Sequence, residues 1–154
     1  MNHDRDSNQN CQEAGCGSAD CNLYKFKERA AYDWAVETTV YVREGQQRTG
    51  IGRKLYEMLE KLLALQNIQN LNACIAYLET ENEFLTHNSI RFHEHMGYRL
   101  VGEFYQCGYK SGHWYNMVWM EKHIGGHEEN PPSVSAFREV RKLAAEKYQL
   151  RDTL

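Results

Sequence analysis

The chain of 154 residues contains 42% hydrophobic residues and carries a net charge of −3 at pH 7, which suits one domain with a hydrophobic core. Its lysines and arginines are scattered along the sequence, so we expect no nucleic-acid-binding surface. No apolar run has the length of a membrane span, and the N-terminus lacks the apolar segment of a secretory signal. We therefore expect a cytoplasmic protein without a membrane partner.

The N-terminal segment, residues 1–23, is polar and small in its residues and has no hydrophobic periodicity, which predicts a poorly ordered tail. Within it, Cys11, Cys16 and Cys21 repeat at C-x4-C-x4-C spacing, with His3 nearby. Structural zinc sites usually use two pairs of ligands at closer spacing. We predict no metal site and interpret these residues as incidental thiols of a solvated tail; metal binding is the alternative.

The first globular pattern is a strand followed by a helix. Residues 32–42 are rich in β-branched and aromatic residues, and alternation from Trp34 places Glu37 on one face and Thr38 on the other. Apolar residues between Ile51 and Leu63 then recur at helical spacing, and charged residues fill the opposite face.

A second strand and helix follow. Residues 71–78 form a short, almost continuous apolar run, as expected of a central strand. Thr86 or Asn88 can cap a helix that runs through Met96, and Gly97 fits the left-handed position after its end.

The last elements are two strands and a helix. Residues 99–106 and 115–121 alternate as strands around a turn at 110–112. After two prolines, residues 135–148 predict a charged helix with a weak apolar stripe. The order strand, helix, strand, helix, strand, strand corresponds to the α/β (α+β) fold class.

The hexapeptide at residues 47–52, between the first strand and its helix, predicts an anion-binding turn. Its two glycines let the backbone approach a ligand, and the helix start offers N–H donors. The spacing of Gly45 and Gly50 matches a P-loop, but Ile51 and Gly52 stand where Lys and Ser or Thr are required. A dinucleotide fingerprint would need a glycine at the position of Leu55. The remaining pattern is Q-x-x-G-x-G.

This pattern resembles the acyl-CoA pyrophosphate signature of the GNAT N-acetyltransferases. Further blocks, in the same order and spacing, resemble the phosphinothricin acetyltransferases within that superfamily: residues 26–34, 36–42, 54–56, 92–98 and 108–114. The resemblance covers residues 24–124, and it leaves residues 125–154 as a linker and C-terminal helix. It implies a GNAT-type mixed sheet with flanking helices, and transfer of acetyl from acetyl-CoA to the amine of phosphinothricin, methionine sulfoximine or related amino acids.

The resemblance also implies roles for individual residues. Glu37 matches the general base, and His93 stands where most of the superfamily has a proton-donating tyrosine. Matches to substrate-contacting positions are Lys27, Arg29 and Tyr32. Matches to acetyl-CoA contacts, which include backbone groups of the strand and the hexapeptide, are Thr39, Val40, Tyr41, Val42, Gln47, Arg48, Thr49, Gly50, Ile51, Gly52 and Asn88.

Structural interpretations compete with several of these roles. Glu37 could be a solvent-facing strand residue, although burial there would raise its pKa toward that of a useful base. Lys27 and Arg29 could be ordinary surface charges, and Tyr32 could serve packing. His93 and His95, at i and i+2, point to different helix faces, so they do not form a metal pair.

Family members have an initial strand, two helices and a hairpin before the block that begins at Lys27, and residues 1–23 resemble none of these. We therefore expect a truncated or replaced homologue whose sheet has an uncovered edge beside residues 34–42. Two hypotheses follow. The first is an N-acetyltransferase with a small-molecule amine substrate, in a family that commonly forms homodimers. The second is a non-catalytic remnant that binds CoA weakly or self-associates.

Overall fold

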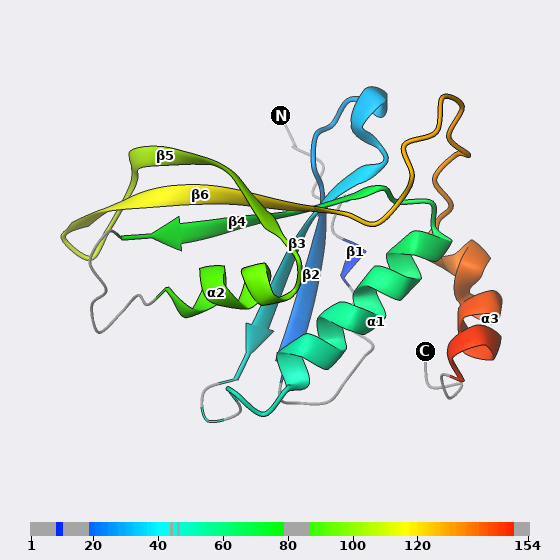
Figure 1. Ribbon diagram of the computed structural model, residues 1–154, viewed down its shortest axis with the longest axis horizontal. Helices are drawn as coiled ribbons and strands as arrows, with labels where there is room; N and C mark the ends of the chain where they lie inside the picture. The colour runs from blue at the N-terminus through cyan, green and yellow to red at the C-terminus, as the bar shows by residue number, and fades with distance from the viewer. Residues whose placement is uncertain (1–8, 11–18, 44, 46, 79–86, 150–154) are drawn as a thin grey trace, which may run out of the picture. The chain divides into compact units, whose positions relative to one another are not determined.

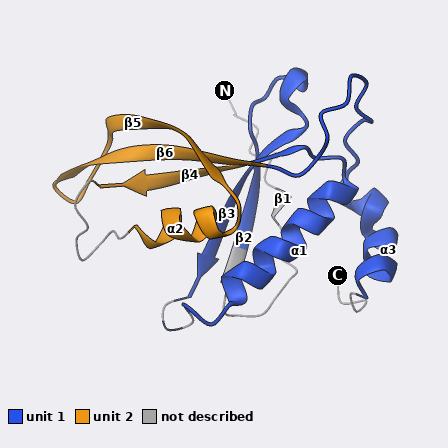
Figure 2. Cartoon of the chain, viewed as in Figure 1, with its two compact units in different colours: residues 1–71, 123–154 blue, residues 72–122 orange. Residues whose placement is uncertain are grey.

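The computed structural model describes residues 9–10, 19–43, 45, 47–78 and 87–149. The chain divides into two compact units, residues 1–71 with 123–154 and residues 72–122 (Figure 2). Within the described ranges, no helix is long and apolar enough to cross a membrane.

Three antiparallel strands form the sheet of the first unit (Figure 1). β1 (Gln9–Asn10) pairs with β2 (Ala19–Lys25), and β2 pairs with β3 (Ala35–Val42) over its whole length. A 3-10 turn, η1 (Ala30–Tyr32), lies in the connection between β2 and β3. Strand β3 confirms the predicted first strand.

Strand β2 corrects two sequence-based predictions. Residues 19–23 are not a poorly ordered tail, and the edge of β3 that we expected to be uncovered is paired with β2, from Ala19 opposite Val42 to Lys25 opposite Val36. The physical reason is that backbone N–H and C=O groups form this ladder, and the amino-acid sequence does not show which of these groups will pair. The rest of the predicted tail, apart from β1, lies outside the described residues.

The three N-terminal cysteines also differ from the prediction. Cys21 is buried in β2, so it is not a solvated residue of a tail. Cys11, Cys16 and His3 lie outside the described residues. Among the residues that are described, no group of three side chains is arranged to hold a metal ion.

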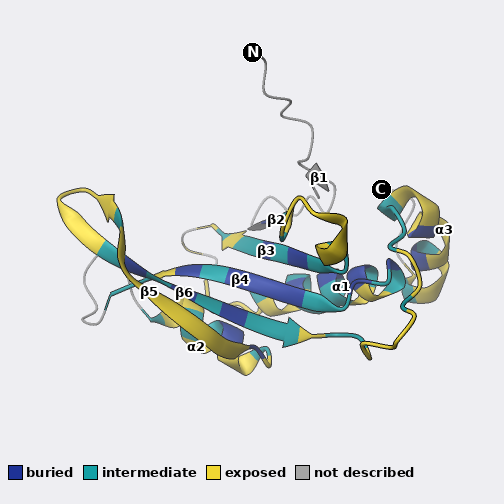
Figure 3. Cartoon of the chain, turned by 90° about the horizontal axis from the view of Figure 1, so that it is seen from above, coloured by how far each residue is buried: buried dark blue, intermediate teal, exposed yellow. Residues whose placement is uncertain are grey.

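Helix α1 (Ile51–Leu65) packs on β2 and β3. Its buried residues, Tyr56, Leu59 and Leu63, recur at three- and four-residue intervals and therefore share one face, which is visible as buried segments in Figure 3. Val36 and Thr38 are the buried residues of β3. The Tyr56 hydroxyl is hydrogen-bonded to the Thr38 side chain, so this core contains a satisfied polar pair.

Helix α3 (Phe137–Tyr148) packs on α1 and starts two residues later than predicted. The preceding segment is held by four hydrogen bonds: Trp34 Nε1 donates to Pro132 O at 2.8 Å, Asn67 Nδ2 to Ser133 O at 2.8 Å, Gln66 Nε2 to Ser135 O at 3.0 Å, and Ser135 N–H to Gln66 O at 3.0 Å. The predicted linker is therefore anchored to the same unit as β3.

The first unit contains a cavity of about 430 Å³ between the end of β2, the start of β3, the end of α1 and the segment before α3. Its walls include Leu23, Leu63, Ile68 and Val134. The hexapeptide at residues 47–52 lies at the opposite ends of β3 and α1, so this cavity is not the predicted anion-binding turn.

The second unit contains β4 (Asn70–Tyr77), which begins at the unit boundary, α2 (Asn88–His95), β5 (Arg99–Lys110) and β6 (His113–His123). The strand order is β4-β6-β5. The hairpin is longer than predicted, and its turn residues Ser111 and Gly112 have φ of 51° and 81°, as a tight two-residue hairpin turn requires.

Helix α2 begins differently from the prediction. Its N-cap is His87, without a side-chain capping bond, and Asn88 is the first helical residue rather than the cap. Thr86 lies outside the described residues. Gly97 has φ of 87°, which confirms the predicted left-handed position after the helix.

Candidate active site

Glu37 lies in the middle of β3 and is half-buried. Burial raises the pKa of its carboxyl group, and the nearby positive charge of Lys27 partly opposes that shift. The pKa of Glu37 is therefore shifted in the direction that we expected from burial. A raised pKa means that Glu37 holds a proton more strongly than a water-exposed carboxylate does, so the site favours proton uptake by Glu37.

Strand β2 contributes residues to the same face, which the sequence-based prediction missed. Tyr24 is directly opposite Glu37 in the antiparallel register, and Asn22 is opposite Thr39. Directly opposed residues project to the same side of a sheet. The alternation of apolar Ala19, Cys21 and Leu23 with polar Asp20 and Asn22 is a sequence signal that could have indicated this strand.

Two of the three predicted substrate-contacting residues, Lys27 and Tyr32, contact Phe26. The Lys27 ammonium is 5.3 Å from the centre of the Phe26 ring. The Phe26 and Tyr32 rings meet edge to face at 6.4 Å. Arg29 precedes η1, and its carbonyl accepts a hydrogen bond from Tyr32 N–H at 2.9 Å.

This arrangement brings Lys27 into electrostatic contact with Glu37 and leaves Arg29 exposed. Tyr32 packs on Phe26 but keeps 44% of its surface exposed. Both interpretations of Tyr32, packing and ligand contact, fit that position.

The predicted anion-binding turn is exposed and contains two residues in the left-handed region of backbone conformation. Gln47, Arg48, Thr49 and Gly50 are exposed, and Arg48 and Gly50 have φ of 63° and 83°. Gly50 is the N-cap of α1 and supplies no capping side chain. The first N–H groups of a helix have no partner within the helix, so those of Ile51 and Gly52 are suited to an anion.

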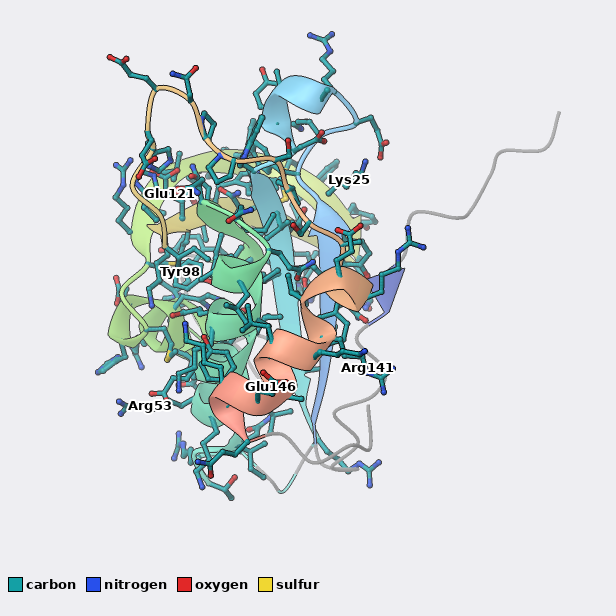
Figure 4. All side chains as sticks on the ribbon, turned by 90° about the vertical axis from the view of Figure 1, so that its right-hand side faces the viewer. Lys25, Arg53, Tyr98, Glu121, Arg141 and Glu146 are labelled. Carbon is teal, nitrogen blue, oxygen red and sulfur yellow. The ribbon has the colours of Figure 1, made fainter. Side chains whose placement is uncertain are left out.

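The charge around this turn is positive. Arg43, Arg48, Arg53 and Lys54 are all exposed. Arg53 Nε donates to Glu57 Oε1 at 2.7 Å, which holds one of these guanidinium groups beside the helix start. Figure 4 shows Arg53 and Lys25 at opposite ends of the unit, so the anion-binding turn is remote from the cavity that Lys25 lines.

The end of β3, from Thr39 to Val42, is the predicted backbone partner of the acyl-CoA arm. This segment pairs with residues 19–22 of β2, so the backbone groups that point toward β2 are already hydrogen-bonded. The predicted pairing with the acyl-CoA arm therefore concerns the backbone N–H and C=O groups of this segment that point away from β2. Of the side chains, Tyr41 is 62% exposed.

His93 lies in the second unit and is buried in α2. Burial lowers the pKa of its ring, although a hydrogen bond to the Ser89 carbonyl partly opposes the shift. A carbonyl only accepts, so Nδ1 of the neutral ring carries the proton in the 2.7 Å contact with Ser89 O. Nε2 of this tautomer is then an acceptor.

The rings of Phe92 and Tyr98 meet His93 edge to face at 5.6 and 5.0 Å and fix its orientation. Asn88 is exposed at the start of the same helix. The two candidate catalytic groups, Glu37 and His93, thus belong to different units (Figure 2).

Curated relatives point to one kind of enzyme. The chain is 36% identical over 97 residues to a phosphinothricin N-acetyltransferase of Streptomyces viridochromogenes, covering 63% of this chain and 49% of the relative. It is 30% identical over 89 residues to an L-methionine sulfoximine/L-methionine sulfone acetyltransferase of Pseudomonas paraeruginosa, covering 58% and 48%. The chain spans about half the length of these relatives.

Solved structures share the fold. A phosphinothricin acetyltransferase from Sinorhizobium meliloti, in complex with AcCoA, matches with a TM-score of 0.65 and 24% identity, over 75% of this chain and 59% of that one. yncA from Salmonella typhimurium, with its cofactor acetyl-CoA, matches with a TM-score of 0.64 and 23% identity, over 75% and 62%. These matches confirm the predicted α/β fold class of GNAT type.

A family model described as an acetyltransferase (GNAT) domain matches residues 9–119, a range that includes β2 and most of the predicted core, residues 24–124. That range is well over half of the chain, and the protein therefore belongs to the GNAT acetyltransferase family.

Proposed function

We propose that this protein is an N-acetyltransferase that transfers acetyl from acetyl-CoA to the amine of a small amino-acid-like substrate such as phosphinothricin or methionine sulfoximine. The observation that carries the proposal is the combination, in one unit, of a helix-start anion site at residues 47–52 and a half-buried carboxylate, Glu37, in the preceding strand. The names of the relatives supply the substrate class.

In the proposed reaction, Gly50 and the N–H groups of the first turn of α1 hold the pyrophosphate of acetyl-CoA. The substrate arrives as an ammonium ion, and Glu37 takes its proton, directly or through water. The amine nitrogen then attacks the thioester carbonyl to form a C–N bond. The nitrogen gives up its second proton as the C–S bond breaks, the leaving CoA thiolate takes up one proton, and the proton held by Glu37 passes to water.

The remaining candidate residues fit supporting roles. Lys27 and Arg29 provide positive charge for the carboxylate and acidic or polar groups of the substrate. His93, neutral and protonated on Nδ1, is assigned a hydrogen-bond acceptor role in the proton-handling part of the reaction. Asn88 is kept as a candidate acetyl-CoA contact.

The test measures release of free CoA thiol from acetyl-CoA over a panel of amino acids that includes phosphinothricin and methionine sulfoximine. Calorimetric titration with CoA on the same sample reports binding separately. Thiol release that depends on an amine supports the proposal. CoA binding without release for any amine identifies the alternative, a non-catalytic remnant, and absence of CoA binding rejects the acetyltransferase.

The proposal includes a homodimer, for which the second unit offers support. Strand β5 is the last strand in the order β4-β6-β5. Six large apolar side chains of the β5–β6 hairpin are more than half exposed: Leu100, Val101, Phe104, Tyr105, Tyr109 and Trp114. Exposed large apolar side chains that gather on one hairpin support an interaction surface there. Sedimentation equilibrium checks the prediction, with Phe104→Glu expected to shift the protein toward monomer.

A further inference from the structure

Strand β2 places an aromatic side chain directly opposite the candidate base. Tyr24 pairs with Glu37 in the antiparallel register, and opposed residues have Cβ atoms about 5 Å apart on the same face of the sheet. Tyr24 keeps 39% of its surface exposed, so part of its ring is available to a ligand. The resemblance on which the predicted site depends assigns no role to this residue.

The substrate of the proposed reaction approaches Glu37 as a cation. An ammonium group beside Glu37 is attracted by the carboxylate, and it is also attracted by the negative face of an adjacent aromatic ring. Lys27 already brings one positive charge near Glu37 and therefore repels a second cation. A neutral ring adds attraction for the ammonium without adding a further charge to the site.

The same cluster already contains a contact of this type. The Lys27 ammonium lies 5.3 Å from the centre of the Phe26 ring, within the range of a cation–π interaction. Phe26 follows Tyr24 by two residues, and its N–H donates to Ala35 O, so Phe26 continues the β2–β3 pairing beyond Lys25. The Phe26 ring thus contacts the Lys27 ammonium, and Tyr24, two residues earlier, is opposite Glu37.

We propose that Tyr24 is a substrate-positioning residue that holds the protonated amine of the acceptor against its ring, beside Glu37. This inference rests on the proposed function for its substrate. Its physical content, a cation-binding ring at the Glu37 face, can be measured without turnover.

Kinetic variants separate the ring from the hydroxyl. Tyr24→Phe keeps the ring face, so its KM for the amine should stay within about twofold of the unmodified protein. Tyr24→Leu removes the ring, and KM should rise about 2- to 30-fold, the range that corresponds to one cation–π contact. The kcat of both variants should change less than KM, because the contact forms before proton transfer.

Tyr148→Leu is the matched control. Tyr148 lies in α3 of the same unit, and its ring also faces lysine ammonium groups, Lys61 and Lys147, both at 5.7 Å. Its replacement removes an aromatic residue and a cation–π contact away from the Glu37 face, so KM should be unchanged. Equal KM values for Tyr24→Leu and the unmodified protein, or equal increases in Tyr24→Leu and Tyr148→Leu, would overturn the inference.

A second measurement needs no acetyl transfer. The ring-proton NMR signals of Tyr24, assigned by their loss in Tyr24→Phe, are followed while tetramethylammonium chloride is added, with sodium chloride as the ionic-strength control. We expect shifts of the Tyr24 signals that saturate with tetramethylammonium and are absent with sodium. Unshifted signals reject the inference even if the enzyme is active. Saturating shifts in a protein that acetylates no amine uphold the ring site and reject the proposed function alone.

Discussion

The two faces of strand β3 differ in burial and in proposed role. Val36 and Thr38 point toward α1 and are buried, and Thr38 is hydrogen-bonded to Tyr56. Glu37, between them, points to the other side, opposite Tyr24, and stays half-buried. Because side chains alternate along a strand, neighbouring residues of one segment can differ in role: Val36 and Thr38 stabilise the fold, and Glu37 is the proposed base. Variants on the two faces should therefore have different phenotypes.

The largest effect is expected on the outer face. Glu37→Gln keeps the size of the side chain but removes the base, so kcat/KM for acetyl transfer should fall about 10²- to 10⁴-fold. The change from carboxylate to amide relieves the unfavourable burial of charge, so the melting temperature should not fall. Thiol release and thermal unfolding measured on one sample check both parts. Near-normal turnover in a folded Glu37→Gln protein would remove Glu37 from the mechanism.

The inner face should show the opposite pattern. Burial raises the pKa of Tyr56 to about 12, so its hydroxyl stays protonated at neutral pH and needs its hydrogen bond to Thr38. Thr38→Val leaves that hydroxyl without this partner and should lower the free energy of unfolding by about 1–3 kcal/mol. Denaturant unfolding measures the loss.

The double variant Thr38→Val/Tyr56→Phe is the control for this interpretation. It removes both polar groups and should recover most of the stability that Thr38→Val loses. Additive losses from the two substitutions would show that the hydrogen bond is not what matters at this position. Acetyl transfer per folded molecule should stay unchanged in both, because these side chains face α1.

Sequence patterns revealed the inner face of β3 and the buried face of α1 because both have strong periodicity and several apolar members. They did not reveal β2, in which Cys21 is the only buried residue among the side chains described. A strand held mainly by backbone pairing with its neighbour has a weak local signal. Tyr24 was not a candidate from the sequence for the same reason, whereas Glu37 became a candidate through its match to a family motif.

The anion-binding turn and the hairpin turn provide the next comparison. Gly50 and Gly112 have nearly equal φ of 83° and 81°, and an added Cβ would meet open space at both. Alanine at either position is strained in the left-handed region, so each variant should be less stable by about 1 kcal/mol. Only Gly50→Ala should also weaken CoA binding, about tenfold, because it displaces N–H donors at the helix start.

Calorimetric titration with CoA and thermal unfolding of the two glycine variants separate strain from binding. If Gly112→Ala weakens CoA binding as much as Gly50→Ala does, the loss reflects general destabilisation, and the hexapeptide has no special role.

The smallest expected effects concern the dependence of stability on pH, to which Glu37 and His93 contribute with opposite signs. The raised pKa of Glu37 means that the folded state holds its proton to higher pH than the unfolded state. Its contribution to stability is therefore complete below the unfolded pKa, near 4.5, and is lost as pH rises through the folded value. The lowered pKa of His93 has the opposite consequence: its contribution is complete above the unfolded pKa, near 6.5, and is lost as pH falls toward the folded value.

Melting temperatures between pH 5 and pH 8 should therefore rise with pH, in part because of His93. The variant His93→Gln should reduce this slope of melting temperature against pH. It should also lower stability at every pH, because the contacts with Phe92 and Tyr98 are lost. His95→Gln is the matched control, since His95 lies two residues away on α2, is exposed, and makes the same kind of Nδ1 contact, to Arg91 O at 2.6 Å. An equal reduction of the slope in both variants would mean that burial of His93 is not its cause. A reduction confined to His93→Gln would show that the ring is buried in its neutral form, which is the state that an acceptor role at Nε2 requires.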